Sequence, residues 1–167
     1  MLKVRAMTAF KYIVAMCIAL LLTSCSWLER PALPKATEIQ VYKAERRMVL
    51  LNGNTIIKEY NFKLGFAPTG HKQFQGDGKT PEGKYYIDRK NPKSRYHLSV
   101  GISYPNKADR AAANGKDPGG DIFIHGTPRP YRFTSKDWTW GCIAVSNSEI
   151  NEIYEVVDIG TTIWIFP

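Results

Sequence analysis

The chain has 167 residues, of which 44% are hydrophobic, so it is long enough to form one domain around a core of its own. The sequence holds neither a C-x-x-C nor an H-x-x-x-H motif, so we expect no metal site, and we expect no cofactor. The formal net charge is +8. The charge is uneven, because residues 63–116 hold eleven Lys or Arg against four Asp or Glu, whereas residues 117–167 hold three against seven. The basic segment indicates either an acidic partner or a solvated basic face.

The amino terminus has the pattern of a secretory signal peptide. Lys3, Arg5 and Lys11 are followed by an apolar run over residues 13–22, which is short for a membrane span. The tetrapeptide LTSC at 22–25 then resembles the lipobox of bacterial lipoproteins, in which the cysteine is lipidated. The alternative is an anchor helix that is not cleaved.

The lipobox resemblance implies a division of the chain and a location. Residues 1–24 would be removed, Cys25 would carry acyl chains, residues 25–37 would form a tether, and residues 38–167 would form the folded domain. Ser26 after the cysteine favours the outer membrane, so we expect a lipid-anchored protein of the cell envelope that faces the periplasm. The membrane is then a partner through the anchor, and export argues against nucleic acid as the acidic partner.

From residue 38 onward the pattern predicts a mainly β domain with long loops and no internal repeat. Strands are expected at 39–43, 46–51, 55–65, 84–88, 96–102, 121–126 and 161–166. The turn NGN at 52–54 predicts a hairpin, and loops are expected over 65–83 and 103–120. One clear helix is expected after SNSE at 146–149, a capping box followed by apolar residues at helical spacing.

Cys142 raises the question of why an exported protein would keep an unpaired thiol. If residues 1–24 are removed and Cys25 is lipidated, Cys142 is the only thiol left of the three cysteines. Such a cysteine indicates intermolecular pairing, a reactive thiol or an inert buried residue. Gly141 before it would allow a sharp turn and leave backbone N–H groups to face a developing oxyanion.

A reactive thiol needs a base, and three histidines are available. His71 lies in a glycine-rich loop, where solvent exposure is expected, and His97 lies in a predicted strand, where packing is expected. His125 ends the apolar strand IFI and precedes a glycine, so its side chain could enter a cleft. The prediction is a thiolate–imidazolium pair of Cys142 and His125, with a structural histidine as the alternative.

The pair HG at 125–126, the segment TWGCIAVSN at 139–147 and the segment GDGKTPEGKYYI at 76–87 together resemble the YkuD-type L,D-transpeptidase family. The 17 positions from His125 to Cys142 fit its spacing, and the resemblance covers about residues 38–167. It implies a β-sandwich-like fold with the cysteine at the end of a cleft. It also implies Cys142 as nucleophile, His125 as base, and the carbonyl of Gly126 as the group that orients the imidazole.

The resemblance further implies a substrate, the peptide stems of peptidoglycan, whose carboxylates would suit the basic segment. These enzymes attack the bond between diaminopimelate and the terminal D-alanine, form an acyl-cysteine and pass the acyl group to the amine of a second stem. The chain departs from the family pattern at Trp140, where many members have histidine, and at Ala144, where many have a substrate-binding arginine. Arg129 and Arg132 are candidate substitutes for that arginine unless both face solvent, and Trp140 is expected to shape the cleft wall.

Two alternatives stay open. A hydrolase on the same scaffold would pass the acyl group to water, as a stem-peptide carboxypeptidase or by releasing a wall-bound lipoprotein. A non-catalytic peptidoglycan-binding lipoprotein would not need Cys142 and His125 together.

Overall fold

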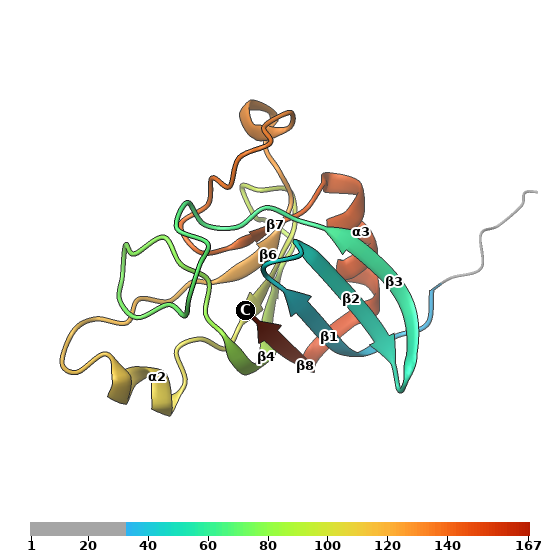
Figure 1. Cartoon of the computed structure of the whole chain (residues 1–167). Coiled ribbons are helices and arrows are strands. Elements are labelled where there is room, and N and C mark those ends of the chain that lie inside the picture. The colour runs from blue at the N-terminus through green and yellow to red at the C-terminus, as the bar shows by residue number, and fades with distance from the viewer. Residues whose placement is uncertain (1–32) are drawn as a thin grey trace, which may run out of the picture. The chain divides into compact units, whose positions relative to one another are not determined.

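The computed structural model describes residues 33–167, and the eight strands in this part of the chain form one mixed sheet (Figure 1). In chain order the strands are β1 (Ala36–Tyr42), β2 (Arg47–Asn52), β3 (Thr55–Asn61), β4 (Gly83–Asn91), β5 (Ser99–Ile102), β6 (Phe123–His125), β7 (Ile143–Ala144) and β8 (Val157–Phe166). Their order across the sheet is β3-β2-β1-β8-β4-β5-β6-β7, with β1–β8 and β6–β7 parallel and the other pairs antiparallel. The expected mainly β domain is confirmed.

The first three strands form the antiparallel meander that the hairpin turn predicts. Asn52 pairs with Thr55 across the turn, and Gly53 has φ +57, a left-handed conformation that glycine adopts without steric cost. The predicted strand at 96–102 is shorter in the structure, because β5 begins at Ser99 and His97 has φ +78. A left-handed residue interrupts the extended backbone that a strand requires.

The core lies on one face of the sheet, where alternate strand residues meet helix α3 (Asn147–Val156). Ile39, Ile163 and Ile165 point into this core from β1 and β8, and none of them is more than 2% exposed. Ile150 and Ile153 enter it from α3, which packs against β5, β6 and β8. Full burial of each such side chain contributes about 1.5–3 kcal/mol, which holds α3 and the strands beside it in place.

Helix α3 begins where the sequence predicts it. The Ser146 side chain accepts a hydrogen bond from the Glu149 N–H, and the Glu149 carboxylate accepts one from the Ser146 N–H at 2.7 Å. This capping box satisfies two N–H groups that the first helical turn leaves without partners. The helix ends at Val156, and its C-cap residue Val157 has an extended backbone and starts β8.

The expected polar loop at 103–120 contains a short helix, α2 (Lys107–Ala112), which the sequence pattern does not reveal. Asn106 caps it by accepting hydrogen bonds from two backbone N–H groups, and the Asp109 carboxylate accepts from the Asn106 N–H at 2.8 Å. Asp109 also accepts from the buried Tyr85 hydroxyl at 3.0 Å. One capping box and one tertiary contact therefore stabilise a helix too short to show apolar periodicity.

The expected signal peptide and the lipidation site Cys25 lie outside the described residues, as does most of the tether. Over residues 33–167 no helix has the length and apolar character needed to cross a membrane.

Candidate active site

Strands β6 and β7 lie side by side and pair in parallel (Figure 1), and their register relates His125 to Cys142. His125 is the last residue of β6 and pairs with Ala144, while Cys142 immediately precedes β7. The same register carried back by one residue places Cys142 beside Phe123. Because side chains alternate along a strand, Cys142 and His125 lie on one face of the two strands, two residues out of step.

His125 is held in one orientation by its surroundings. The side chain is only 3% exposed, and its Nδ1 lies 2.7 Å from the Gly126 carbonyl oxygen. A carbonyl only accepts, so Nδ1 carries the proton and Nε2 of the neutral ring is left with its lone pair. The imidazole stacks on Tyr96, with 4.5 Å between ring centroids, and meets Trp138 edge-on at 5.7 Å.

Burial also sets the charge of the histidine. It lowers the pKa of His125 below its ordinary value of 6.5, and the hydrogen bond to Gly126 opposes this shift only in part. The ring is therefore neutral at pH 7 and able to accept a proton at Nε2. Gly126 itself must be glycine, because a Cβ there would lie 2.6 Å from the Tyr96 carbonyl oxygen.

The thiol of Cys142 is half-buried, and its Sγ donates to the Asp121 carbonyl oxygen at 3.5 Å. Burial raises the pKa of the thiol, while the Phe123 N–H and the nearby Lys72 ammonium act in the opposite direction. Among the described residues no hydrogen bond joins Sγ to His125. The two pKa directions favour a resting pair of neutral thiol and neutral imidazole, in place of a preformed ion pair.

Gly141 is required by the backbone that carries the thiol. Its φ is +120, and a Cβ at this position would lie 2.4 Å from the Lys79 carbonyl oxygen. Its own N–H donates to the Thr139 hydroxyl at 3.2 Å, so that group is already engaged. The Cys142 N–H has no acceptor among the described residues, which makes it the backbone donor left to meet a developing oxyanion.

Cys142 opens into a cavity of about 570 Å³, here named the thiol cavity. Its lining includes Trp140, which is 69% exposed and packs edge-on against Phe66 at 4.9 Å. The charged residues in the lining are Lys72, Asp117 and Asp121. Lys72 is paired with Asp77 at 2.8 Å and Asp121 with Arg89 at 2.9 Å, so Asp117 is the charged residue of this lining that has no ion pair within residues 33–167.

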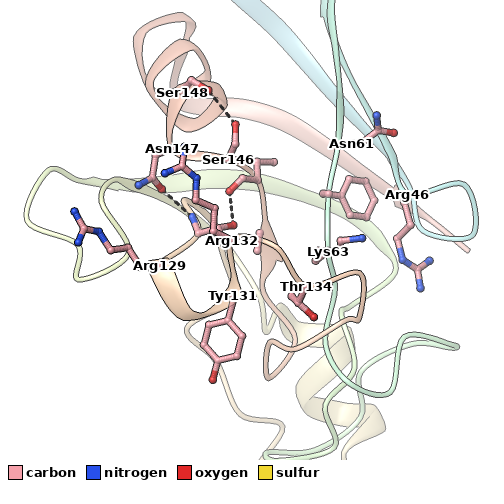
Figure 2. Close-up of a pocket in the computed structure, with 14 residues that line it drawn as sticks. Arg46, Asn61, Lys63, Arg129, Tyr131, Arg132, Thr134, Ser146, Asn147 and Ser148 are labelled. Atoms are coloured by element: carbon pink, nitrogen blue, oxygen red, sulfur yellow. Dashed lines mark hydrogen bonds between the residues drawn. The ribbon is translucent and has the colours of Figure 1, made fainter.

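A second cavity of about 740 Å³, here named the cationic cavity, contains Ala144, the position of the missing family arginine (Figure 2). Figure 2 shows Arg129 and Arg132 on one wall and Arg46 and Lys63 on the other. None of the lining residues is an Asp or Glu. Its lining residues are Arg46, Asn61, Phe62, Lys63, Thr127, Arg129, Tyr131, Arg132, Thr134, Ala144, Val145, Ser146, Asn147 and Ser148.

Only some of these four cations already have a partner. Arg46 forms an ion pair with Asp137 at 2.6 Å, and the Lys63 ammonium donates to the Ser135 carbonyl at 3.0 Å. Within residues 33–167, Arg129 and Arg132 have no ion pair. They belong to the 3₁₀ helix η1 (Arg129–Tyr131) and its C-cap.

The two cavities lie at opposite ends of the β6–β7 pair. Asp121 and Cys142, in the thiol cavity, precede the two strands, whereas Thr127 and Ala144, in the cationic cavity, lie at their carboxyl ends. The structure therefore places Trp140 in the thiol cavity with Cys142. It places Arg129 and Arg132 together in the cationic cavity, near the carboxyl end of β6.

The other two histidines are engaged elsewhere. His71 accepts a hydrogen bond from the Glu82 N–H at 2.9 Å and lies 3.3 Å from Asp109. His97 is exposed instead of packed, and its Nε2 lies 2.7 Å from Asn151. His125 is thus the histidine that shares a strand pair with Cys142.

Sequence reasoning missed Tyr96, Thr80 and Thr139 as parts of the site. Tyr96 covers the imidazole from the segment before β5, and no sequence motif marks it. Thr139 accepts from the Gly141 N–H and donates to the Cys142 carbonyl at 2.7 Å. Thr139 lies in TWGC and Thr80 lies in KTPEG, and these motif positions could have indicated both residues from the sequence. A buried threonine hydroxyl forms a hydrogen bond, commonly with the backbone.

Comparison with known proteins places this geometry in context. The family model of the YkuD L,D-transpeptidase catalytic domain matches residues 36–165. YafK of Escherichia coli (strain K12), a candidate L,D-transpeptidase, is 32% identical over 126 residues, which are 71% of this chain and 46% of YafK.

Solved structures show the same fold. The crystal structure of Pgp2, a helical cell shape determining protein of Campylobacter jejuni, aligns with a TM-score of 0.63 and 28% identity over 79% of this chain and 48% of Pgp2. The L,D-transpeptidase of Xylanimonas cellulosilytica aligns with a TM-score of 0.55 and 14% identity over 81% of this chain and 63% of that chain.

The chain thus spans about half the length of YafK and of Pgp2. The family match nevertheless covers the whole sheet from β1 almost to the end of β8, with both cavities and the β6–β7 pair. The chain belongs to the YkuD family of L,D-transpeptidase catalytic domains.

Proposed function

We propose that this protein is a cysteine L,D-transpeptidase that acts on the stem peptides of peptidoglycan, with Cys142 as nucleophile and His125 as base. The observation that carries the proposal is the β6–β7 pair, which holds the thiol and the Nε2 of a neutral, oriented imidazole on one face. Rotation about the Cα–Cβ bond of Cys142 is the movement that would bring Sγ from Asp121 to Nε2. A purely binding protein has no need of this arrangement.

The proposed acylation begins when Nε2 of His125 takes the thiol proton. Sγ of Cys142 then forms a bond to the carbonyl carbon of diaminopimelate, and the electron pair of the C=O bond moves to oxygen. Collapse of this intermediate breaks the C–N bond, and the imidazolium returns its proton to the leaving amine of D-alanine. The Gly126 carbonyl keeps the ring in the required tautomer throughout.

The amine of a second stem peptide then attacks the thioester, and Cys142 leaves as the thiol. This step restores the enzyme and forms the crosslink. Water in place of the amine would give the hydrolase, with a tripeptide as the product. The two outcomes share every residue proposed for acylation and differ only in the acceptor.

Arg129 and Arg132 are proposed to bind carboxylates of the stem peptide in place of the family arginine absent at Ala144. Support comes from the cationic cavity, which contains both arginines and Ala144 and has no acidic residue in its lining. A guanidinium without an ion pair binds a carboxylate through two parallel hydrogen bonds. Trp140 is proposed to form the wall of the thiol cavity next to the nucleophile.

We also propose that the protein is lipidated at Cys25 and faces the periplasm from the outer membrane. Only the sequence pattern at residues 1–26 supports this. Cys25→Ala should abolish incorporation of labelled palmitate and move the protein out of the membrane fraction. Unchanged labelling of that variant would refute lipidation and would leave the catalytic proposal unaffected.

The similarity to Pgp2, a helical cell shape determining protein of Campylobacter jejuni, makes cell shape the phenotype to score in a deletion strain.

The experiment for the enzyme is mass spectrometry of the protein after incubation with a disaccharide–tetrapeptide. We expect an acyl adduct on Cys142 and release of D-alanine, and neither with Cys142→Ala as the control. Addition of a second stem as acceptor then separates the two enzymes, because a transpeptidase yields a crosslinked dimer and a hydrolase yields only tripeptide. Absence of both adduct and D-alanine with the unmodified chain would favour the binding lipoprotein.

A further inference from the structure

The segment GDGKTPEG, at residues 76–83, has no part in the mechanism above, yet it packs directly against Gly141, the residue before the nucleophile. The Lys79 carbonyl oxygen lies where a side chain of Gly141 would be, and the Gly78 carbonyl occupies the same place at Gly65, which itself lies against the Gly141 N–H. Thr80 follows and is fully buried. Its hydroxyl donates to the Gly141 carbonyl oxygen at 2.8 Å.

This hydrogen bond acts on a particular peptide unit. The Gly141 carbonyl and the Cys142 N–H belong to the same peptide group, which is planar and trans. In a trans peptide the C=O and N–H point in opposite directions, so a bond that holds the oxygen also aims the N–H. The Cys142 N–H, the backbone donor without an acceptor in the described part of the chain, therefore points away from Thr80.

The peptide units before and after this one are held as well. The Thr139 hydroxyl donates to the Cys142 carbonyl oxygen at 2.7 Å and accepts from the Gly141 N–H at 3.2 Å. Two buried threonines thus hold the backbone on both sides of the nucleophile, and only Thr80 acts on the peptide unit that contains the Cys142 N–H. Donation to the Gly141 carbonyl also polarises that peptide and strengthens its N–H as a donor.

We propose that Thr80 is a positioning residue that aims the Cys142 N–H at the oxyanion formed during acylation. This rests on the proposed function, in which the electron pair of the substrate carbonyl moves to oxygen as the C–S bond forms. Thr80 touches neither the substrate nor Sγ, and its effect passes through one peptide plane. It should therefore matter only for reactions of Cys142 that form an oxyanion.

The test compares two reactions of the same thiol in Thr80→Val, which keeps the side-chain shape and removes the hydroxyl. Acetylation by p-nitrophenyl acetate forms a tetrahedral oxyanion and requires no recognition of a peptide. Alkylation by iodoacetamide is a direct displacement and forms none. We expect acetylation to slow about 10- to 100-fold, since loss of a whole oxyanion donor costs about 100- to 1,000-fold, and alkylation to keep its rate.

Two controls accompany this variant. Thr80→Ser keeps the hydroxyl and should acetylate at close to the original rate. Thr161→Val removes another buried threonine hydroxyl, which donates to the Ala36 carbonyl at 3.5 Å from β8, and should change neither reaction. Thermal melting of each variant reports loss of folding separately.

Unchanged acetylation in Thr80→Val would overturn the proposal. Equal losses of acetylation and alkylation would overturn it too, because they would show that the hydroxyl supports the thiol or the fold in general. The tetrapeptide experiment stands apart from this one. If the unmodified chain accepts acetate but not the tetrapeptide, the proposed substrate is wrong and the role of Thr80 is still decided by the acetate rates.

Discussion

The thiol cavity and the cationic cavity share the strands β6 and β7 but are built in different ways. Around the thiol, closely packed backbone at the glycines and two buried threonine hydroxyls fix the peptide units on either side of Cys142. The cationic cavity instead relies on long charged side chains from η1 and from the residues around β3. Chemistry that needs fixed geometry is placed on backbone, and recognition of charge is placed on flexible side chains.

The first test of this comparison is His125→Ala, which removes the proposed base and should have the largest effect. General-base catalysis contributes about 100- to 10,000-fold, so acylation by the tetrapeptide at pH 7 should fall by that order. Burial raises the pKa of Cys142 above its ordinary value of 9.0, so the variant should recover only at pH values above about 9, where the thiol ionises unaided. The measurement is the rate of D-alanine release against pH.

The unmodified chain should show the opposite profile. Because burial lowers the pKa of His125 below 6.5, the neutral base is present at pH 7 and is lost only as the pH falls through that lower value. His97→Ala removes an exposed histidine and serves as the control, which should match the unmodified chain at every pH. A flat profile for His125→Ala, at the original rate, would remove histidine from the mechanism.

The second test addresses the wall of the thiol cavity. Lys72 and Asp77 form a buried ion pair with side chains 3% and 4% exposed, and the Asp77 carboxylate also accepts from the N–H groups of Gln73, Phe74 and Lys79. Asp77→Asn should destabilise the fold by about 3 kcal/mol at pH 7, because it leaves the lysine charge buried without its partner. Urea unfolding monitored by circular dichroism gives the measurement.

The loss of stability in Asp77→Asn should depend on pH. Burial alone would raise the pKa of Asp77, but the ion pair and the backbone N–H groups bring it below its ordinary value of 3.8. The stabilisation is therefore present above pH 3.8 and is lost as the pH falls through the lower folded value, where variant and unmodified chain should converge. Asp158→Asn, which removes an exposed partner of Lys35, should change little at any pH. An equal effect at both sites would contradict the importance of the buried pair.

The smallest expected effect is in the cationic cavity. Replacement of both Arg129 and Arg132 by Gln should raise KM for the tetrapeptide about tenfold and leave kcat nearly unchanged, because each lost carboxylate contact is worth about 0.7 kcal/mol at an exposed site. Lys136→Gln removes a charge from the same connection outside the cavity lining and is the matched control. Steady-state kinetics at low and high salt should show the difference between the unmodified chain and the double variant shrinking as charges are screened. A fall in kcat with unchanged KM would place the two arginines in the chemical step instead.

Much of the fold followed from local patterns. The NGN turn, the alternation in β1 and β8, and the capping box of α3 each act over a few residues, so the sequence was enough to predict them. Helix α2 was missed because its stability comes from Asn106, Asp109 and a tertiary bond to Tyr85. No apolar repeat accompanies such a helix, and only the folded chain brings Tyr85 to it.

For the site, sequence reasoning proposed the two reactive residues but not their setting. Parallel strands cannot be joined by a tight turn and need a connection of about a dozen residues or more, which gives the 17-position spacing of His125 and Cys142 a physical reason. Neither the stacking of Tyr96 on the imidazole nor the bond from Thr80 to Gly141 could be read from the chain, because both join segments that meet only in space. The sequence also could not predict that the Cys142 thiol and the His125 imidazole are both neutral at rest, because this depends on the burial of both groups.

The connection from β6 to β7 has a consequence for how such proteins diversify. It is anchored near its start, where the Thr127 N–H donates to the Asn147 side chain at 2.9 Å and its hydroxyl donates to the Val145 carbonyl at 2.6 Å. Near its end, the Asp137 carboxylate accepts from the Leu64 N–H at 2.8 Å. Between these anchors the residues are largely exposed. We therefore expect changes of sequence or length between Pro128 and Lys136 to alter the cationic cavity while the nucleophile and base keep their places on the strands. Tyr131, which stacks on Trp138 at 4.1 Å, is the residue of this stretch that links it to the imidazole.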